Sequence, residues 1–150
     1  MTGLGFGQRW WDSRQYVKAD NDPALVSCLL LKRLRAETAV AGVRLLFVLQ
    51  YGGNEVVQWA KQPDDALTVL KCADDDGIET VDTWEPLKSV LNEHGIDALS
   101  ALYVMHGDKA HYGNWGHMSS AGNDFVAQLL AERLRRRSGW TSTALSWDIS

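Results

Sequence analysis

Cysteine and excess positive charge are scarce in this sequence, and each shortage excludes a class of protein. Only two of the 150 residues are cysteine, which excludes a disulfide-rich secreted scaffold. Cys28 and Cys72 lie far apart and without metal-ligand spacing, so we expect buried free thiols in preference to a disulfide. Lys and Arg total 15 against 19 Asp and Glu, and the net charge of -4 argues against a nucleic-acid partner.

Long hydrophobic runs are also missing. The longest, residues 24–31 and 43–49, are far shorter than the roughly 20 residues that span a bilayer, so we expect no membrane span. The N-terminus lacks the basic start, apolar stretch and cleavage site of a secretory signal. If Met1 is the natural start, the expected location is cytoplasmic. For a longer parent protein the compartment stays open.

What is present suits one globular domain over residues 1–150, with a core of about 22–137 and irregular tails. Hydrophobic residues make up 45% of the chain and charged residues 23%, which is typical of a soluble folded domain. Asp22 as N-cap, Pro23 in the first turn and Gly42 at the end predict a first helix. Residues 43–53 then predict a strand buried on both faces.

The middle of the chain continues this alternation. We expect a helix over residues 62–77 and a strand over 78–84, which with the preceding strand makes a βαβ crossover and requires parallel strands. A short helix over 85–94 follows, then a loop or short strand over 98–105. The last helix, over 124–137, presents an apolar stripe that includes Val126, Leu129, Leu130 and Leu134. The fold class is therefore α/β.

Two strands are too few for a complete parallel sheet. Further strands could come from residues 99–105 and the tails, or from another subunit, or from the N-terminal half of a longer protein. We favour the last of these. The composition of residues 43–51 is that of a central strand, which needs a neighbour on each edge.

A specific resemblance lies in "GHMSSAGNDFVAQLLAERL", residues 116–134. In this segment Gly122 follows His117 by five residues and Ala127 follows it by ten. It resembles the last conserved block of the SGNH (GDSL-like) hydrolases, whose catalytic histidine has this spacing, and residues 24–136 resemble the second half of that family's fold. The resemblance implies a flavodoxin-like, three-layer αβα fold with a parallel sheet whose N-terminal strands are missing. It also implies hydrolysis of a small acyl or acetyl ester, or of an acylated carbohydrate, with His117 as general base and no cofactor.

Two positions near His117 depart from the family pattern. Asn114 stands three residues before His117, where the family has the Asp that orients the imidazole. Asp108 is the nearest carboxylate that could replace it, and Asp108 with His111 forms a second candidate pair. We expect Trp115 to line the site and bind substrate.

The nucleophile is the larger departure. The chain has no GDS block, no GxND block, no GxSxG elbow and no HExxH metal motif; "GGNE" at residues 52–55 resembles the Asn block only superficially. The first hypothesis is therefore an esterase, or the C-terminal portion of one, whose Ser lies outside this chain. The alternative is a non-catalytic domain whose Trp-rich flanks, with Trp10, Trp11, Trp140 and Trp147, bind carbohydrate or a protein. A decayed or mis-started reading frame is the third possibility.

Two charge clusters are assigned no function. Acidic residues 74–76 precede a helix-ending glycine, and the arginines of residues 132–137 suit the negative pole of a helix. We expect both to be solvated surfaces and assign no metal.

Overall fold

A parallel strand pair occupies the middle of the molecule in the computed structural model, which describes residues 22–109, 111 and 115–138. Strand β1 (Leu46–Leu49) pairs with β2 (Glu79–Asp82) from Leu46 opposite Glu79 to Leu49 opposite Asp82. Helix α3 (Asp64–Asp75) connects them after the short helix α2 (Gly53–Gln58). The predicted βαβ crossover and its parallel strands are confirmed.

Helix α1 (Pro23–Val40) begins and ends as its sequence predicts. The Asp22 carboxylate accepts a hydrogen bond from the Ala24 N–H at 2.9 Å, and Pro23 occupies the first turn. After the last turn, Gly42 adopts a φ of 65°, a conformation that favours glycine.

The second half of the chain forms α4 (Trp84–Ala101), β3 (Tyr103–Met105), β4 (Trp115–Met118) and α5 (Ser120–Ser138). Gly95, with φ of 81°, interrupts α4 where we expect the short helix to end, but the chain then resumes helix to Ala101. The prediction of a loop or strand is therefore wrong for residues 98–101. Strands β3 and β4 form a separate antiparallel pair.

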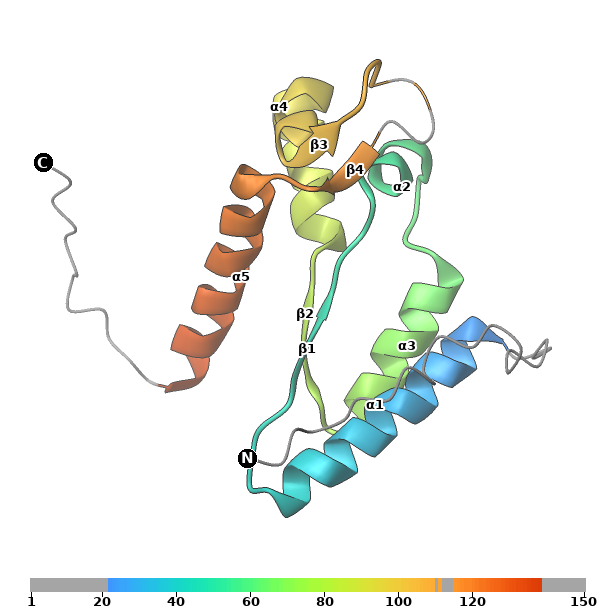
Figure 1. Ribbon diagram of the computed structural model, residues 1–150, viewed down its shortest axis with the longest axis vertical. Helices are drawn as coiled ribbons and strands as arrows, with labels where there is room; N and C mark the ends of the chain where they lie inside the picture. The colour runs from blue at the N-terminus through green and yellow to red at the C-terminus, as the bar shows by residue number, and fades with distance from the viewer. Residues whose placement is uncertain (1–21, 110, 112–114, 139–150) are drawn as a thin grey trace, which may run out of the picture.

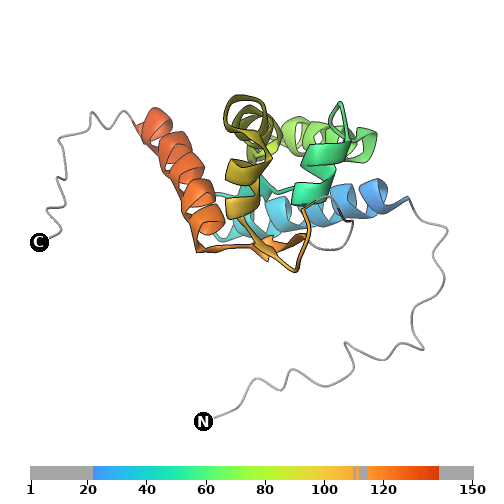
Figure 2. The same ribbon diagram turned by 90° about the horizontal axis from the view of Figure 1, so that it is seen from above.

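These elements form an α/β structure with two small sheets. Helices α1 and α3 lie on one side of β1 and β2, and α5 lies on the other side (Figure 1). Seen from above, α4 stands between α5 and the α2–α3 segment (Figure 2). Among the described residues each sheet has two strands.

The prediction that β1 is buried on both faces is wrong. All four of its residues are only partly buried. The physical reason is that β1 has β2 on one edge and, within the described residues, no strand on the other. The apolar stripe of α5 is also only partly confirmed: Val126 is buried, whereas Leu134 is 52% exposed.

Two groups of buried side chains hold the described residues together. One lies at the end where β1 and β2 terminate and contains Tyr51, Val56, Trp84, Leu87, Leu99 and Tyr103. The other fixes α1 and α3 to the strands and contains Ala24, Leu31, Val69, Ala73 and Ile78.

The expectation of free thiols is wrong, because the structure joins Cys28 to Cys72 in a disulfide with a Cα–Cα distance of 5.5 Å. Cys28 lies one turn after Ala24 on α1, and Cys72 lies one turn after Val69 on α3. Because α1 and α3 pack side by side through these faces, 44 residues of sequence separation become a direct contact.

The expected lack of a membrane span can be checked for part of the chain. Among the described residues, no helix has both the length and the apolar character that crossing a bilayer requires.

Candidate functional site

Several polar and aromatic side chains lie at the carboxyl end of the parallel pair. Tyr51 and Gly52 follow β1, Asp82 ends β2, and α2 and the β3–β4 pair lie at this same end (Figure 1). In open α/β sheets ligands bind outside the carboxyl ends of the strands. This end is therefore the candidate site.

Trp115 fixes β4 in this position. Its ring lies edge-on to that of Tyr103, with 5.4 Å between centroids, and its indole N–H donates to the Lys109 carbonyl at 3.0 Å. The ring also lies against Gly53 at the start of α2, where a Cβ would fall 1.9 Å from Trp115 Cε3. These contacts give the half-buried ring a packing role. A substrate contact by Trp115 stays a prediction.

His117 lies on β4 with its side chain exposed to solvent. The next residue, Met118, packs against the buried group around Leu87 and Leu99. The imidazole is therefore accessible to solvent, which a general base that meets substrate requires, and the strand β4 that carries it lies at the carboxyl end of the parallel pair (Figure 1).

The residues after His117 are anchored to the end of α4. The Ser119 N–H donates to the Leu102 carbonyl at 2.9 Å, and the Ser119 hydroxyl donates to the Ala101 carbonyl at 2.7 Å. That hydroxyl also accepts from the Gly122 N–H at 3.2 Å, as an N-cap side chain does. Gly122 is buried against the Leu102 carbonyl, so its spacing from His117 has a packing reason.

The structure brings Asp108 to His111. Asp108 Oδ2 lies 3.1 Å from His111 Nδ1, and both side chains are exposed. This is the second candidate pair of the sequence. Asn114 lies outside the described residues, and a contact of Asp108 with His117 stays a prediction.

A hydrogen-bond network that the sequence did not predict joins residues at the carboxyl ends of both strands. The Gln62 amide donates to Tyr51 Oη at 2.6 Å and to Asp82 Oδ2 at 2.8 Å. The other oxygen of Asp82 accepts from the Trp84 N–H at 3.0 Å. No motif in the sequence links these residues, and Asp82 falls inside the predicted strand of residues 78–84, so no local signal identified the network.

Tyr103 extends this network below the surface. Its hydroxyl donates to the Tyr51 carbonyl at 2.9 Å. Burial raises the pKa of the Tyr103 hydroxyl, and burial likewise raises the pKa of Tyr51 above its ordinary value. Both phenols therefore stay protonated at neutral pH and act as structural hydrogen-bonding groups.

A hollow of about 320 Å³ opens beside the end of β1. Its walls include Leu49, Tyr51, Trp59 and the first turn of α1. Glu55 reaches it as well, but the carboxylate already accepts from the Gly52 N–H at 2.9 Å. The walls are mostly apolar, which suits an apolar ligand or another part of a polypeptide.

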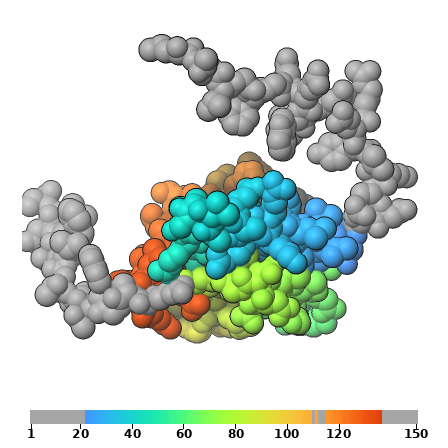
Figure 3. Space-filling view, turned by 90° about the horizontal axis from the view of Figure 1, so that it is seen from below, coloured from blue at the N-terminus to red at the C-terminus, as the bar shows by residue number. Residues whose placement is uncertain are grey.

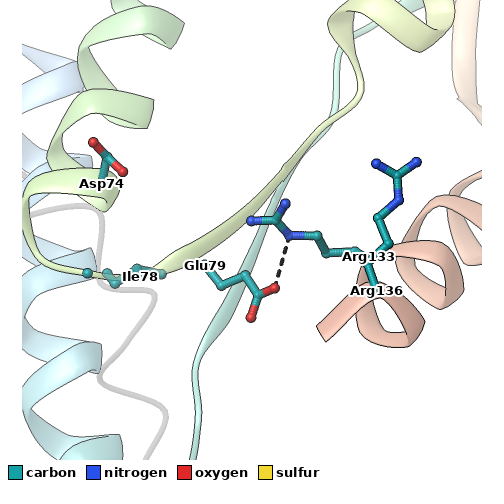
Figure 4. Close-up of a pocket in the computed structure, with 6 residues that line it drawn as sticks. Asp74, Ile78, Glu79, Arg133 and Arg136 are labelled. Carbon is teal, nitrogen blue, oxygen red and sulfur yellow. Dashed lines mark hydrogen bonds and ion pairs between the residues drawn. The ribbon is translucent and has the colours of Figure 1, made fainter. Parts of the chain in front are cut away.

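A larger hollow, of about 460 Å³, lies at the amino end of β2 and so away from His117. Figure 4 shows Glu79 between Asp74 on one wall and Arg133 and Arg136 on the other. Glu79 pairs with Arg133 at 2.9 Å and with Arg44 at 3.1 Å. This surface is an ion-pair cluster that joins α5 to β2 and to the segment before β1.

The acidic residues 74–76 provide no metal centre among the residues that the structure describes. Asp74 and Asp75 are exposed, and Asp75 pairs with Lys71 at 2.8 Å. Within residues 22–109, 111 and 115–138, no cluster of three or more His, Cys, Asp or Glu side chains could hold a metal ion.

Comparisons with family models, with curated proteins and with solved structures found no match to this chain.

Proposed function

We propose that this chain is the histidine-bearing portion of an SGNH-like ester hydrolase, with His117 as general base and a Ser nucleophile supplied by polypeptide outside it. The observation that supports this proposal is that His117 is exposed on β4, a strand that lies at the carboxyl end of the parallel pair. Trp115 and Ser119, on either side of it, are both anchored by hydrogen bonds, so the backbone that carries the imidazole is held in place.

In the proposed reaction His117 moves a proton in two steps. It takes the proton of the Ser hydroxyl as the oxygen attacks the ester carbonyl carbon, and gives it to the departing alkoxide. It then takes a proton from the water that attacks the acyl-enzyme and gives that proton to the departing Ser oxygen, which releases the acid and restores the Ser hydroxyl. Asp108 or Asn114 orients the imidazole, and the substrate is a small acyl or acetyl ester or an acylated carbohydrate.

The same proposal includes the complete fold to which the two described strands would belong. The pair β1–β2 is then part of a larger flavodoxin-like sheet with three αβα layers. Support comes from β1, whose apolar residues Leu46–Leu49 are only partly buried in the described part of the chain. In this arrangement residues 1–150 form one domain, completed by upstream polypeptide or by another subunit.

The test is hydrolysis of p-nitrophenyl acetate by this chain and by a version extended upstream in the genome. We expect activity in the extended protein and a loss of about 10³-fold or more in kcat/KM for His117→Ala. His94→Ala, which changes an exposed histidine on α4, is the matched control. A folded extended protein without activity, or one in which His111→Ala removes the activity and His117→Ala does not, contradicts the assignment.

The second candidate is a non-catalytic domain that binds a carbohydrate or a protein. Trp59 favours it, because this side chain is 38% exposed and lines both the hollow of about 320 Å³ and a neighbouring one of about 410 Å³. The tryptophans first considered for this role, at residues 10, 11, 140 and 147, lie outside the described residues. Binding in a glycan array that survives His117→Ala and is lost in Trp59→Ala would support this candidate over the hydrolase.

A further inference from the structure

The hollow of about 320 Å³ beside the end of β1 has walls from two helices that a disulfide joins. The first turns of α1 and of α3 contribute to these walls. The two helices lie side by side (Figure 3), and Cys28 and Cys72 lie just beyond the residues that line the hollow. The bond between them limits how far the two walls can separate, so the hollow is a preformed feature of the surface.

The charged side chains that line this hollow are both acidic. They are Glu55 on α2 and Asp65 on α3, and none of the described lining residues is Lys, Arg or His. The N-termini of the neighbouring helices carry partial positive charges of about half a unit each. At α1 this charge is offset by the carboxylate of Asp22, which accepts from the Ala24 N–H. Two full negative charges exceed the partial charges that remain, and a negative hollow favours a cationic ligand.

The lysines around Trp59 are already engaged elsewhere. Lys61 pairs with Asp64 at 2.9 Å. Lys88 donates to the Trp59 carbonyl at 2.7 Å, and its ammonium lies over the ring of Trp84, 5.3 Å from the centroid. Neither lysine lines the hollow, so neither neutralises its carboxylates at close range.

Two aromatic side chains, Tyr51 and Trp59, line the hollow together with these carboxylates. Trp59 is 38% exposed, and among aromatic rings the face of an indole binds cations best. Burial raises the pKa of Tyr51, and the charges of Asp82 and Glu55 raise it further, so this phenol stays neutral. A volume of about 320 Å³ lies at the lower end for ligand sites, which limits the ligand to a small molecule.

We propose that this hollow binds a small organic cation, in which an apolar or aromatic group carries an ammonium. The apolar group packs against Leu49 and Val69, and the ammonium lies beside Glu55 and Asp65 within reach of the Trp59 ring. This site is independent of the esterase proposal, because none of its residues acts in that reaction. The positive charge of the ligand also separates it from the carbohydrate or protein of the second candidate.

The experiment titrates the full chain with three probes of similar shape and different charge at neutral pH. Phenethylamine is cationic, phenethyl alcohol is neutral and hydrocinnamate is anionic. Binding is followed by the NMR signal of the Trp59 indole N–H, which is assigned by its loss in Trp59→Phe. We expect saturable binding of phenethylamine that is about 10-fold tighter than that of the alcohol, and the weakest binding for hydrocinnamate. The proposal is overturned if phenethylamine shows no saturable binding, or if either of the other probes binds as tightly.

Two variants test whether the carboxylates attract the cation. Glu55→Gln keeps a side-chain oxygen that can accept from the Gly52 N–H, and Asp65→Asn keeps the shape of an exposed side chain. Each is expected to weaken phenethylamine binding about three-fold or more and to leave the binding of phenethyl alcohol unchanged.

Asp75→Asn is the matched control, because it changes an exposed carboxylate of α3 that does not line the hollow. This variant should bind phenethylamine as the native chain does. Native affinity for the amine in both Glu55→Gln and Asp65→Asn overturns the proposal. An equal loss in Asp75→Asn also overturns it, because the amine then responds to the overall charge of the protein.

Discussion

The carbonyl oxygen of Leu102 occupies the space that a side chain at Gly122 would need: an ideal Cβ on Gly122 falls 2.0 Å from that oxygen. The first turn of α5 therefore lies directly on the end of α4. Since Ser119 bonds to the same end of α4, this contact fixes the backbone that follows His117.

Gly122→Ala is expected to destabilise the protein. The added methyl group cannot fit against a backbone oxygen, so helix α5 must shift, and we expect a loss of about 1–3 kcal/mol in the free energy of unfolding. Urea unfolding measures it. Ala121→Ser, at the exposed neighbouring position, is the control, and equal stability of the two variants would show that the contact with Leu102 is not tight.

The Cys28–Cys72 disulfide is expected to stabilise the packing of α1 on α3. It closes a loop of 44 residues of sequence separation, for which loop entropy gives about 4 kcal/mol. Reduction by dithiothreitol should lower the urea midpoint of the native chain and leave that of Cys28→Ser/Cys72→Ser unchanged.

A thiol titration checks the bond itself. Two free thiols in the folded, non-reduced protein would contradict it. Because such bonds persist in oxidising compartments, confirmation of the disulfide would argue against the expected cytoplasmic location, which stays a prediction.

Alkaline pH is expected to destabilise the fold through Tyr51 and Tyr103. Burial raises the pKa of both hydroxyls, so above the ordinary tyrosine value of about 10 the unfolded chain loses protons that the native state retains. Below pH 10 these two hydroxyls leave the free energy of unfolding unchanged. Above pH 10 the free energy of unfolding falls as the pH rises toward the pKa values that the hydroxyls have in the native protein. Tyr103→Phe should reduce the slope of unfolding free energy against pH above 10, and an unchanged slope would indicate that this phenol ionises freely when folded.

Glu79→Gln is expected to weaken the attachment of α5 to the strands. The Glu79 side chain is 9% exposed and pairs with Arg133 on α5 (Figure 4) and with Arg44 in the segment before β1. We expect a loss of about 1–2 kcal/mol in unfolding free energy, since charge-assisted bonds at a buried carboxylate exceed surface pairs. The control is Glu37→Gln, whose partner Arg33 and own side chain are both exposed, and a similar loss there would remove the special role of Glu79.

Local sequence signals predicted the boundaries of several elements, where a cap or a glycine turn marks them. Asp22 and Pro23 mark the start of α1, and Gly42 adopts the positive φ that ends it. Gly77, with φ of 64°, separates α3 from β2 as expected. The resumption of α4 after Gly95 was missed, because a glycine with positive φ signals a helix end and says nothing about the next turn.

The candidate site was predicted in part. The spacing of His117 and Gly122 singled out a segment whose strand β4 lies at the carboxyl end of β1 and β2 with His117 exposed, and the catalytic role of that histidine stays a prediction. The Tyr51–Gln62–Asp82 network was not predicted, because its members meet only after α3 has returned the chain to the sheet.

The sequence by itself determined the start and end of α1, the boundary between α3 and β2, and the parallel βαβ unit, because caps, glycine turns and apolar runs act over a few residues. Only the tertiary structure decided that Cys28 meets Cys72 and that Gly122 meets Leu102. It likewise decided that β1 is half-buried and that α1 keeps an apolar outer surface. These are contacts between distant segments, and they depend on how whole helices pack, which no local pattern specifies.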